Sequence, residues 1–134
     1  MIIYIILLSL LAGIGKGTRD RLLLPHHYNN SIFKNFKDQR YFDPLISGEN
    51  KYKNYDKKQG AKFPGSTNIF VWVTDLPHLS ASITIISFCG IALLSSNVDL
   101  NNFKEYILLF LYIRIPFAIG FYSFYKLILI KKRK

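Results

Sequence analysis

Two long runs of this chain carry almost no charge, and they limit what the chain can fold into. The run 79–98 contains no charged residue, and the run 106–130 contains only one arginine and one lysine. A helix rises about 1.5 Å per residue, so residues 79–96 would span roughly 27 Å and residues 106–130 roughly 37 Å. The hydrocarbon core of a bilayer is about 30 Å thick. The apolar side chains of the second run supply roughly −7 kcal/mol of insertion free energy, which outweighs the ~3 kcal/mol cost of Arg114. The two runs predict a transmembrane helical hairpin over residues 67–130, with helices at about 67–96 and 106–130.

The first 15 residues form a shorter apolar run, which we predict to be an N-terminal membrane anchor (residues 1–15). Residues 1–14 are about 21 Å long as a helix, so the run crosses a bilayer only where the bilayer thins or the helix ends reach outward. A secretory signal begins with positive charge, but here the cations Lys16, Arg19 and Arg21 follow the apolar run. That order favours a retained anchor, and an interfacial or cleaved segment is the alternative. The expected fold class is all-α: a small integral membrane protein with two to three transmembrane helices.

Glycine and capping residues predict two helix boundaries. The sequence GIGKGT at residues 13–18 differs from a phosphate-binding Walker loop, which needs Gly-Lys-Ser/Thr between a strand and a helix. We therefore predict that these residues end the first helix and form a flexible exit. After the Pro64-Gly65 turn, Ser66 or Thr67 is expected to cap the next helix.

The middle segment, residues 16–66, is basic, aromatic and rich in turn-forming residues. Eleven Lys and Arg stand against five Asp and Glu over residues 16–74. Because such cations pair with anionic headgroups and aromatic rings favour the interface, we predict a segment that lies on the membrane surface. The expected headgroup-binding residues are Lys16, Arg19, Arg21, Lys51, Lys53 and Arg114. The alternative is a solvated, partly ordered loop; since no nucleic-acid recognition module is visible, no nucleic-acid partner is expected.

The distribution of positive charge predicts the orientation. Two spans separate the middle segment from the basic tail at residues 131–134, so both lie on one side of the membrane, and the positive-inside rule assigns that side to the cytoplasm. We expect a multi-pass protein of the cell membrane (the inner membrane in a bacterium) with a cytoplasmic C-terminus. The single cysteine, Cys89, lies in an apolar run and allows no internal disulfide.

Three histidines and one aspartate are the candidates for chemistry. Asp75 and His78 are three residues apart, a spacing that places them on one helix face. If His26 and His27 fold back to meet them, the four side chains can hold zinc or a similar divalent metal, with Asp75 as a ligand or general base. The structural alternative is that Asp75 caps a helix or forms a salt bridge with a nearby Lys or Arg, while His78 lies at the membrane interface.

Several short pieces of the sequence, in a fixed order, carry a resemblance. GKGTRD, PHHY, NKYKN, FPGST and TDLPH resemble segments of a family of small uncharacterised integral membrane proteins of bacteria and their phages. The likeness covers roughly residues 15–79. The resemblance implies no activity, but it points to the following positions: Lys16, Arg19, Asp20, His26, His27, Asp75 and His78.

These observations favour an accessory or scaffold subunit that binds an anionic membrane surface or a protein partner, either another membrane subunit or a second copy of itself. One alternative is a metal-dependent, membrane-bound hydrolase or transferase that acts on a lipid-linked phosphate. Another is a small, holin-like pore former. Enzyme and non-enzyme interpretations both stay open at this point.

Overall fold

The computed structural model of the protein describes residues 1–130, and the predicted basic tail at 131–134 lies outside the described residues. The three long helices are α1 (Ile2–Leu23), α3 (Leu76–Ser95) and α4 (Phe103–Tyr122), and α4 continues as a π-helix, Ser123–Ile128. The connection from α1 to α3 holds the short α2 (Pro25–Asn29) and the 3₁₀ turns Ile32–Asn35, Ser47–Lys51, Lys53–Tyr55, Lys57–Gln59 and Val71–Val73. No strand forms within residues 1–130, which confirms the predicted all-α class.

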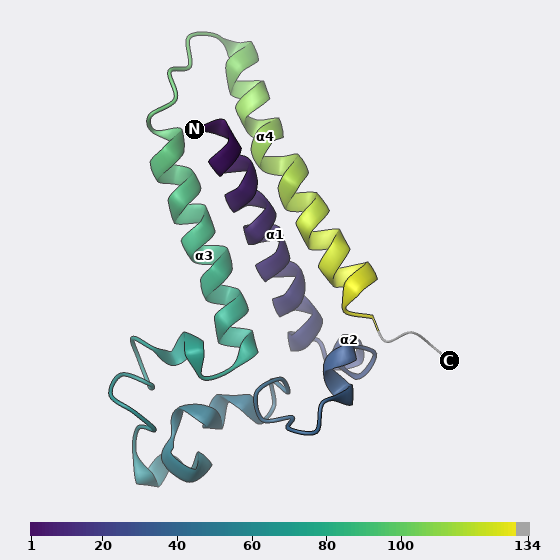
Figure 1. Cartoon of the computed structure of the whole chain (residues 1–134), viewed down its shortest axis with the longest axis vertical. Coiled ribbons are helices and arrows are strands. Elements are labelled where there is room, and N and C mark those ends of the chain that lie inside the picture. The colour runs from purple at the N-terminus through teal and green to yellow at the C-terminus, as the bar shows by residue number, and fades with distance from the viewer. Residues whose placement is uncertain (131–134) are drawn as a thin grey trace.

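The three long helices stand side by side, with α1 between α3 and α4 (Figure 1). The N-terminus lies at the same end of the bundle as the loop that joins α3 to α4. At the opposite end, the residues that connect α1 to α3 fold into a compact layer across the helix ends (Figure 1). We call this layer, residues 24–75, the cap.

Each of the three long helices is long and apolar enough to cross a membrane. Their outward faces carry large apolar side chains that no other part of the described chain covers, among them Ile86, Leu93, Phe110 and Ile119. In water such surfaces would be costly, whereas lipid tails are a suitable environment for them. The helices are therefore compatible with a multi-pass membrane protein.

Glycines decide how closely α1 approaches its neighbours. A Cβ atom added at Gly13 would lie 2.1 Å from the Phe117 carbonyl oxygen of α4, and one added at Gly120 would lie 2.4 Å from the Leu10 carbonyl oxygen of α1. On the other side, a Cβ atom at Gly15 would lie 2.7 Å from the carbonyl oxygen of Ser80 in α3. Small residues at these positions let the helix backbones touch, as is common where helices pack in membranes.

The predicted helix end at residues 13–18 is therefore wrong. The first helix continues to Leu23, eight residues past the predicted anchor (23 − 15). Its glycines are contact points for two other helices, and tertiary packing overrides their low helix propensity.

The boundary predicted for the second helix is also wrong. Helix α3 begins at Leu76, not near residue 67, and its cap is Asp75. Ser66 serves another purpose: its Oγ donates to the Lys51 carbonyl at 2.7 Å and accepts from the Lys62 amide at 3.1 Å, which ties together the two ends of a cap loop. Pro77 fits the first turn of α3, where a proline leaves no helical hydrogen bond unmade. Helix α4 begins at Phe103 rather than at residue 106.

A small apolar core joins the cap to the end of the helix bundle. It consists of the buried residues Leu22, Tyr28, Phe33 and Leu129. The Ile32 amide donates to the Leu129 carbonyl at 3.0 Å, so the chain beyond the π-helix is held against the cap. The cap is thereby fixed to both α1 and the end of α4.

Ionisation of Tyr28 is expected to destabilise this core at alkaline pH. Burial, with a smaller effect of the Asp43 carboxylate, raises the pKa of Tyr28 from 10.0 to about 12. Between pH 10 and pH 12 the unfolded chain releases this proton while the folded protein keeps it, so deprotonation stabilises the unfolded state relative to the folded one. We expect the free energy of unfolding to fall by up to roughly 2–3 kcal/mol as the pH rises from 10 to 12.

This expectation can be checked by denaturant unfolding in detergent micelles, followed by circular dichroism at a series of pH values. Tyr28→Phe keeps the ring but removes the ionising group, and so its alkaline loss of stability should be smaller. Identical pH profiles for the variant and the original protein would contradict the assignment.

Candidate functional site

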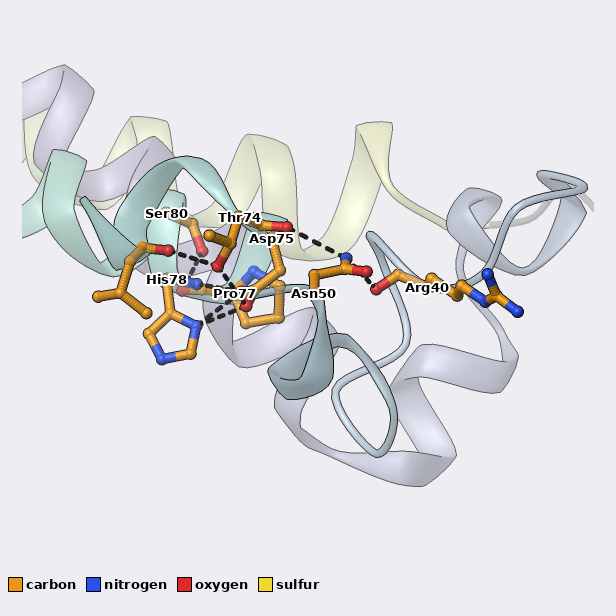
Figure 2. Close-up of polar contacts among 8 residues, drawn as sticks. Arg40, Asn50, Thr74, Asp75, Pro77, His78 and Ser80 are labelled. Atoms are coloured by element: carbon orange, nitrogen blue, oxygen red, sulfur yellow. Dashed lines mark hydrogen bonds and ion pairs between the residues drawn. The ribbon is translucent and has the colours of Figure 1, made fainter. Parts of the chain in front are cut away.

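The first turn of α3 holds the aspartate and the histidine that the sequence singled out. Asp75 is completely buried. One of its carboxylate oxygens accepts a hydrogen bond from the His78 backbone amide at 2.8 Å, which caps the helix. The His78 ring nitrogen Nδ1 lies 2.8 Å and 2.7 Å from the two carboxylate oxygens. Both groups point toward each other across the helix start (Figure 2).

Cap residues hold the chain that leads into this turn. The Asn50 side-chain amide donates to the carbonyl of Thr74 at 3.1 Å and to that of Arg40 at 2.6 Å, and so bridges two segments of the cap (Figure 2). The Leu76 amide donates to the Tyr41 carbonyl at 3.0 Å. Burial, and secondly the Asp75 carboxylate, raise the pKa of Tyr41 above its ordinary value. The Asp75 carboxylate therefore acts electrostatically on Tyr41 of the cap.

The orientation of His78 leaves one ring nitrogen available. Since Nδ1 faces a carboxylate, it carries the proton, and Nε2 points away from Asp75 (Figure 2). The His78 side chain is 43% exposed. It borders a pocket of about 150 Å³, whose lining is Arg19, Leu23, Pro44, Ser47, Gly48, Pro77, His78 and Ala81. With a carboxylate behind it, Nε2 can accept a proton from a group in the pocket, and the nearby Arg19 can attract an anion.

The other two histidines lie in a different arrangement. His26 is exposed on α2. Nδ1 of His27 shares a short hydrogen bond with the Tyr125 hydroxyl of the π-helix, and the two ring centroids are 5.2 Å apart. The four predicted residues thus form one pair at the start of α3, one contact between α2 and the π-helix, and one solvated histidine. Within residues 1–130, no three His, Cys, Asp or Glu side chains come together in a group that could hold a metal ion.

The cations predicted to bind headgroups divide into exposed and engaged groups. Arg19, Lys53 and Arg114 are exposed, whereas Lys16 forms an ion pair with Asp20 one turn along α1. The ammonium of Lys51 lies over the Tyr52 ring, 5.5 Å from its centroid. Arg21 differs from the rest of the set because it is only 6% exposed.

Sequence reasoning missed three contributors, Tyr41, Asn50 and Tyr125. Tyr41 accepts a hydrogen bond with its backbone carbonyl, and Asn50 donates to the backbone carbonyls of Arg40 and Thr74. Such contacts have no recognisable sequence motif. Tyr125 carried a weak signal, because tyrosines gather where apolar helices reach the headgroup region.

No protein-family model, curated protein or solved structure matches this chain.

Proposed function

We propose that the protein is an integral membrane protein whose cap binds the anionic headgroups of one membrane face, and that it serves there as an accessory or scaffold subunit. The observation that carries this proposal is the separation of charge between the two ends of the bundle. Residues 16–74, at the cap end, hold eleven Lys and Arg and five Asp and Glu, whereas the charged side chains of residues 96–105, at the α3–α4 end, are Asp99, Lys104 and Glu105. Each cation near an anionic surface contributes about 1 kcal/mol of attraction.

An apolar loop at the edge of the cap supports the same proposal. Ile69, Phe70, Trp72 and Val73 all expose much of their side chains, and Ile69 is 73% exposed. The loop ends two residues before Asp75, the cap of α3. Aromatic and aliphatic side chains next to the start of a membrane helix are suited to insertion among lipid headgroups. We infer that the loop 69–73 enters the interface while the neighbouring cations pair with lipid phosphates.

A firm connection between cap and helices suits a scaffold. The Leu76 amide bonds to Tyr41 and the Ile32 amide bonds to Leu129, so the cap is tied to both α3 and the end of α4. A basic surface held in a fixed orientation at the membrane can order anionic lipids or receive a partner that also binds them.

The single tryptophan, Trp72, offers a direct test. The full-length protein is reconstituted in nanodiscs that contain brominated phosphatidylglycerol or brominated phosphatidylcholine at equal mole fraction. We expect the anionic quencher to reduce Trp72 fluorescence about twofold more at low salt, because the cap cations enrich it nearby. In about 1 M salt the Debye length falls to about 3 Å, and the preference should largely disappear.

A reporter at the other end of the bundle provides the matched control. Phe103 is exposed at the start of α4, and Phe103→Trp in a Trp72→Phe background moves the fluorophore to the α3–α4 end. This reporter should be quenched equally by the two lipids. Equal quenching at Trp72, or the same anionic preference at both positions, would refute the proposed function.

A further inference from the structure

Arg21 is a buried cation near the end of α1, and no Asp or Glu side chain within residues 1–130 pairs with it. It is 6% exposed. Its Nη2 donates a long bond of 3.4 Å to the Asn30 carbonyl, and its buried Nε has no hydrogen-bond partner among the described residues. All eight Asp and Glu lie within residues 1–130, and no ion pair within that range includes Arg21.

A guanidinium in this setting needs an anion. Removing such a group from water is unfavourable unless a charge or good hydrogen bonds replace the water. The Tyr125 ring, 5.6 Å from the guanidinium carbon, provides a cation–π contact, and the C-terminal end of α1 attracts positive charge. Neither contact bonds to the Nε hydrogen.

Two further polar side chains lie at the same place. The Tyr125 hydroxyl bonds to Nδ1 of His27, and Tyr125 is also the ring beside Arg21. Arg21 comes from α1, His27 from α2 and Tyr125 from the π-helix, so three elements meet here. Short π-helical stretches are frequent at functional sites.

We propose that Arg21, His27 and Tyr125 form a binding site for one phosphate group of an anionic lipid. The inference rests on the proposed function, since it requires the cap end of α1 to lie at headgroup depth. The planar fork of an arginine matches two phosphate oxygens. The bond between the Tyr125 hydroxyl and His27 Nδ1 leaves that pair one further donor hydrogen, on Nε2 or on the hydroxyl according to the tautomer, for a third phosphate oxygen. The site would hold one lipid specifically, in contrast to the general attraction of the cap for anionic headgroups.

Native mass spectrometry of the full-length protein in detergent tests the site, with phosphatidylglycerol as the probe. We expect one lipid to bind in a saturable manner, and Arg21→Gln to weaken this binding about tenfold or more. Tyr125→Phe, which removes only the hydroxyl, should weaken it about two- to fivefold. The matched control is Arg40→Gln, because the exposed Arg40 also lies over a tyrosine ring, 4.0 Å from its centroid, and its replacement should change the affinity less than twofold.

Inorganic phosphate, added in a second arm, identifies the source of the ligand. If inorganic phosphate does not displace the bound lipid, the ligand of the site is the phosphate of a lipid headgroup. Displacement by inorganic phosphate that depends on Arg21 assigns it to a soluble phosphate compound. If Arg21→Gln does not fold, as judged by circular dichroism, Arg21→Lys and Tyr125→Phe decide the matter, and wild-type affinity in both overturns the site.

A folded Arg21→Gln variant with unchanged lipid affinity would also overturn it, as would an equal loss in Arg40→Gln. These failures are separate from that of the proposed function, because Trp72 quenching reports the general anionic preference. That preference is expected to persist in Arg21→Gln.

Discussion

Gly13→Ala is expected to lower the free energy of unfolding by about 2 kcal/mol, although alanine is the better helix former. The new methyl carbon would lie 2.1 Å from the Phe117 carbonyl oxygen, far inside the contact distance, and a backbone atom cannot rotate away. Helices α1 and α4 would have to separate. Gly17 and Gly120 belong to the same contact, so the separation would also loosen the packing at these two positions.

The sign of this effect makes it a sharp test. In an isolated helix the same change would be stabilising by about 1 kcal/mol. Unfolding of the purified protein in detergent, followed by circular dichroism, measures the difference. Gly48→Ala is the matched control: no atom lies within 4 Å of its added methyl group, so its stability should stay within roughly 0.5 kcal/mol of the original. A Gly13→Ala protein as stable as the original would mean that α1 and α4 do not pack in this way.

The long helices could be predicted because their signal is local. A run of apolar residues long enough to cross a bilayer indicates a helix whatever surrounds it, and all three runs form helices. The glycines of α1 could not be interpreted in the same way. A glycine after an apolar run ends many helices in water, but the same residue allows close packing when another helix lies against it. Only the positions of α3 and α4 decide between the two.

The candidate site could be predicted in part, for a related reason. Asp75 and His78 are three residues apart, so the start of the helix brings them together. The expectation that Asp75 caps a helix is confirmed. Serine and aspartate are both common helix caps, so the sequence offers Ser66 as well as Asp75. In the structure the Ser66 hydroxyl bonds to the distant Lys51 carbonyl instead, and Asp75 caps α3. His27 and Tyr125 are 98 positions apart, so their contact depends on how the end of α4 packs against the cap.

Asp75→Ala is expected to destabilise the protein by about 2–4 kcal/mol, the largest effect we expect from a polar residue. The change removes the cap of α3, which contributes roughly 1 kcal/mol, and it deprives His78 of the carboxylate beside its Nδ1. Asp75→Asn should lose only about half as much, because an asparagine oxygen can still accept the His78 amide hydrogen. The exposed Asp99 gives the matched control, and Asp99→Ala should change stability by less than about 0.5 kcal/mol.

A spectroscopic titration of tyrosine separates an effect of the carboxylate's charge from a general loss of fold. The Asp75 carboxylate is the second cause, after burial, of the raised pKa of Tyr41. In a folded Asp75→Asn protein, the pKa of Tyr41 should therefore move down toward its ordinary value without reaching it, since burial persists. Tyr41→Phe identifies the Tyr41 component of the absorbance change. An unaltered tyrosine titration in Asp75→Asn, together with wild-type stability in Asp75→Ala, would show that this carboxylate neither starts α3 nor acts on the cap.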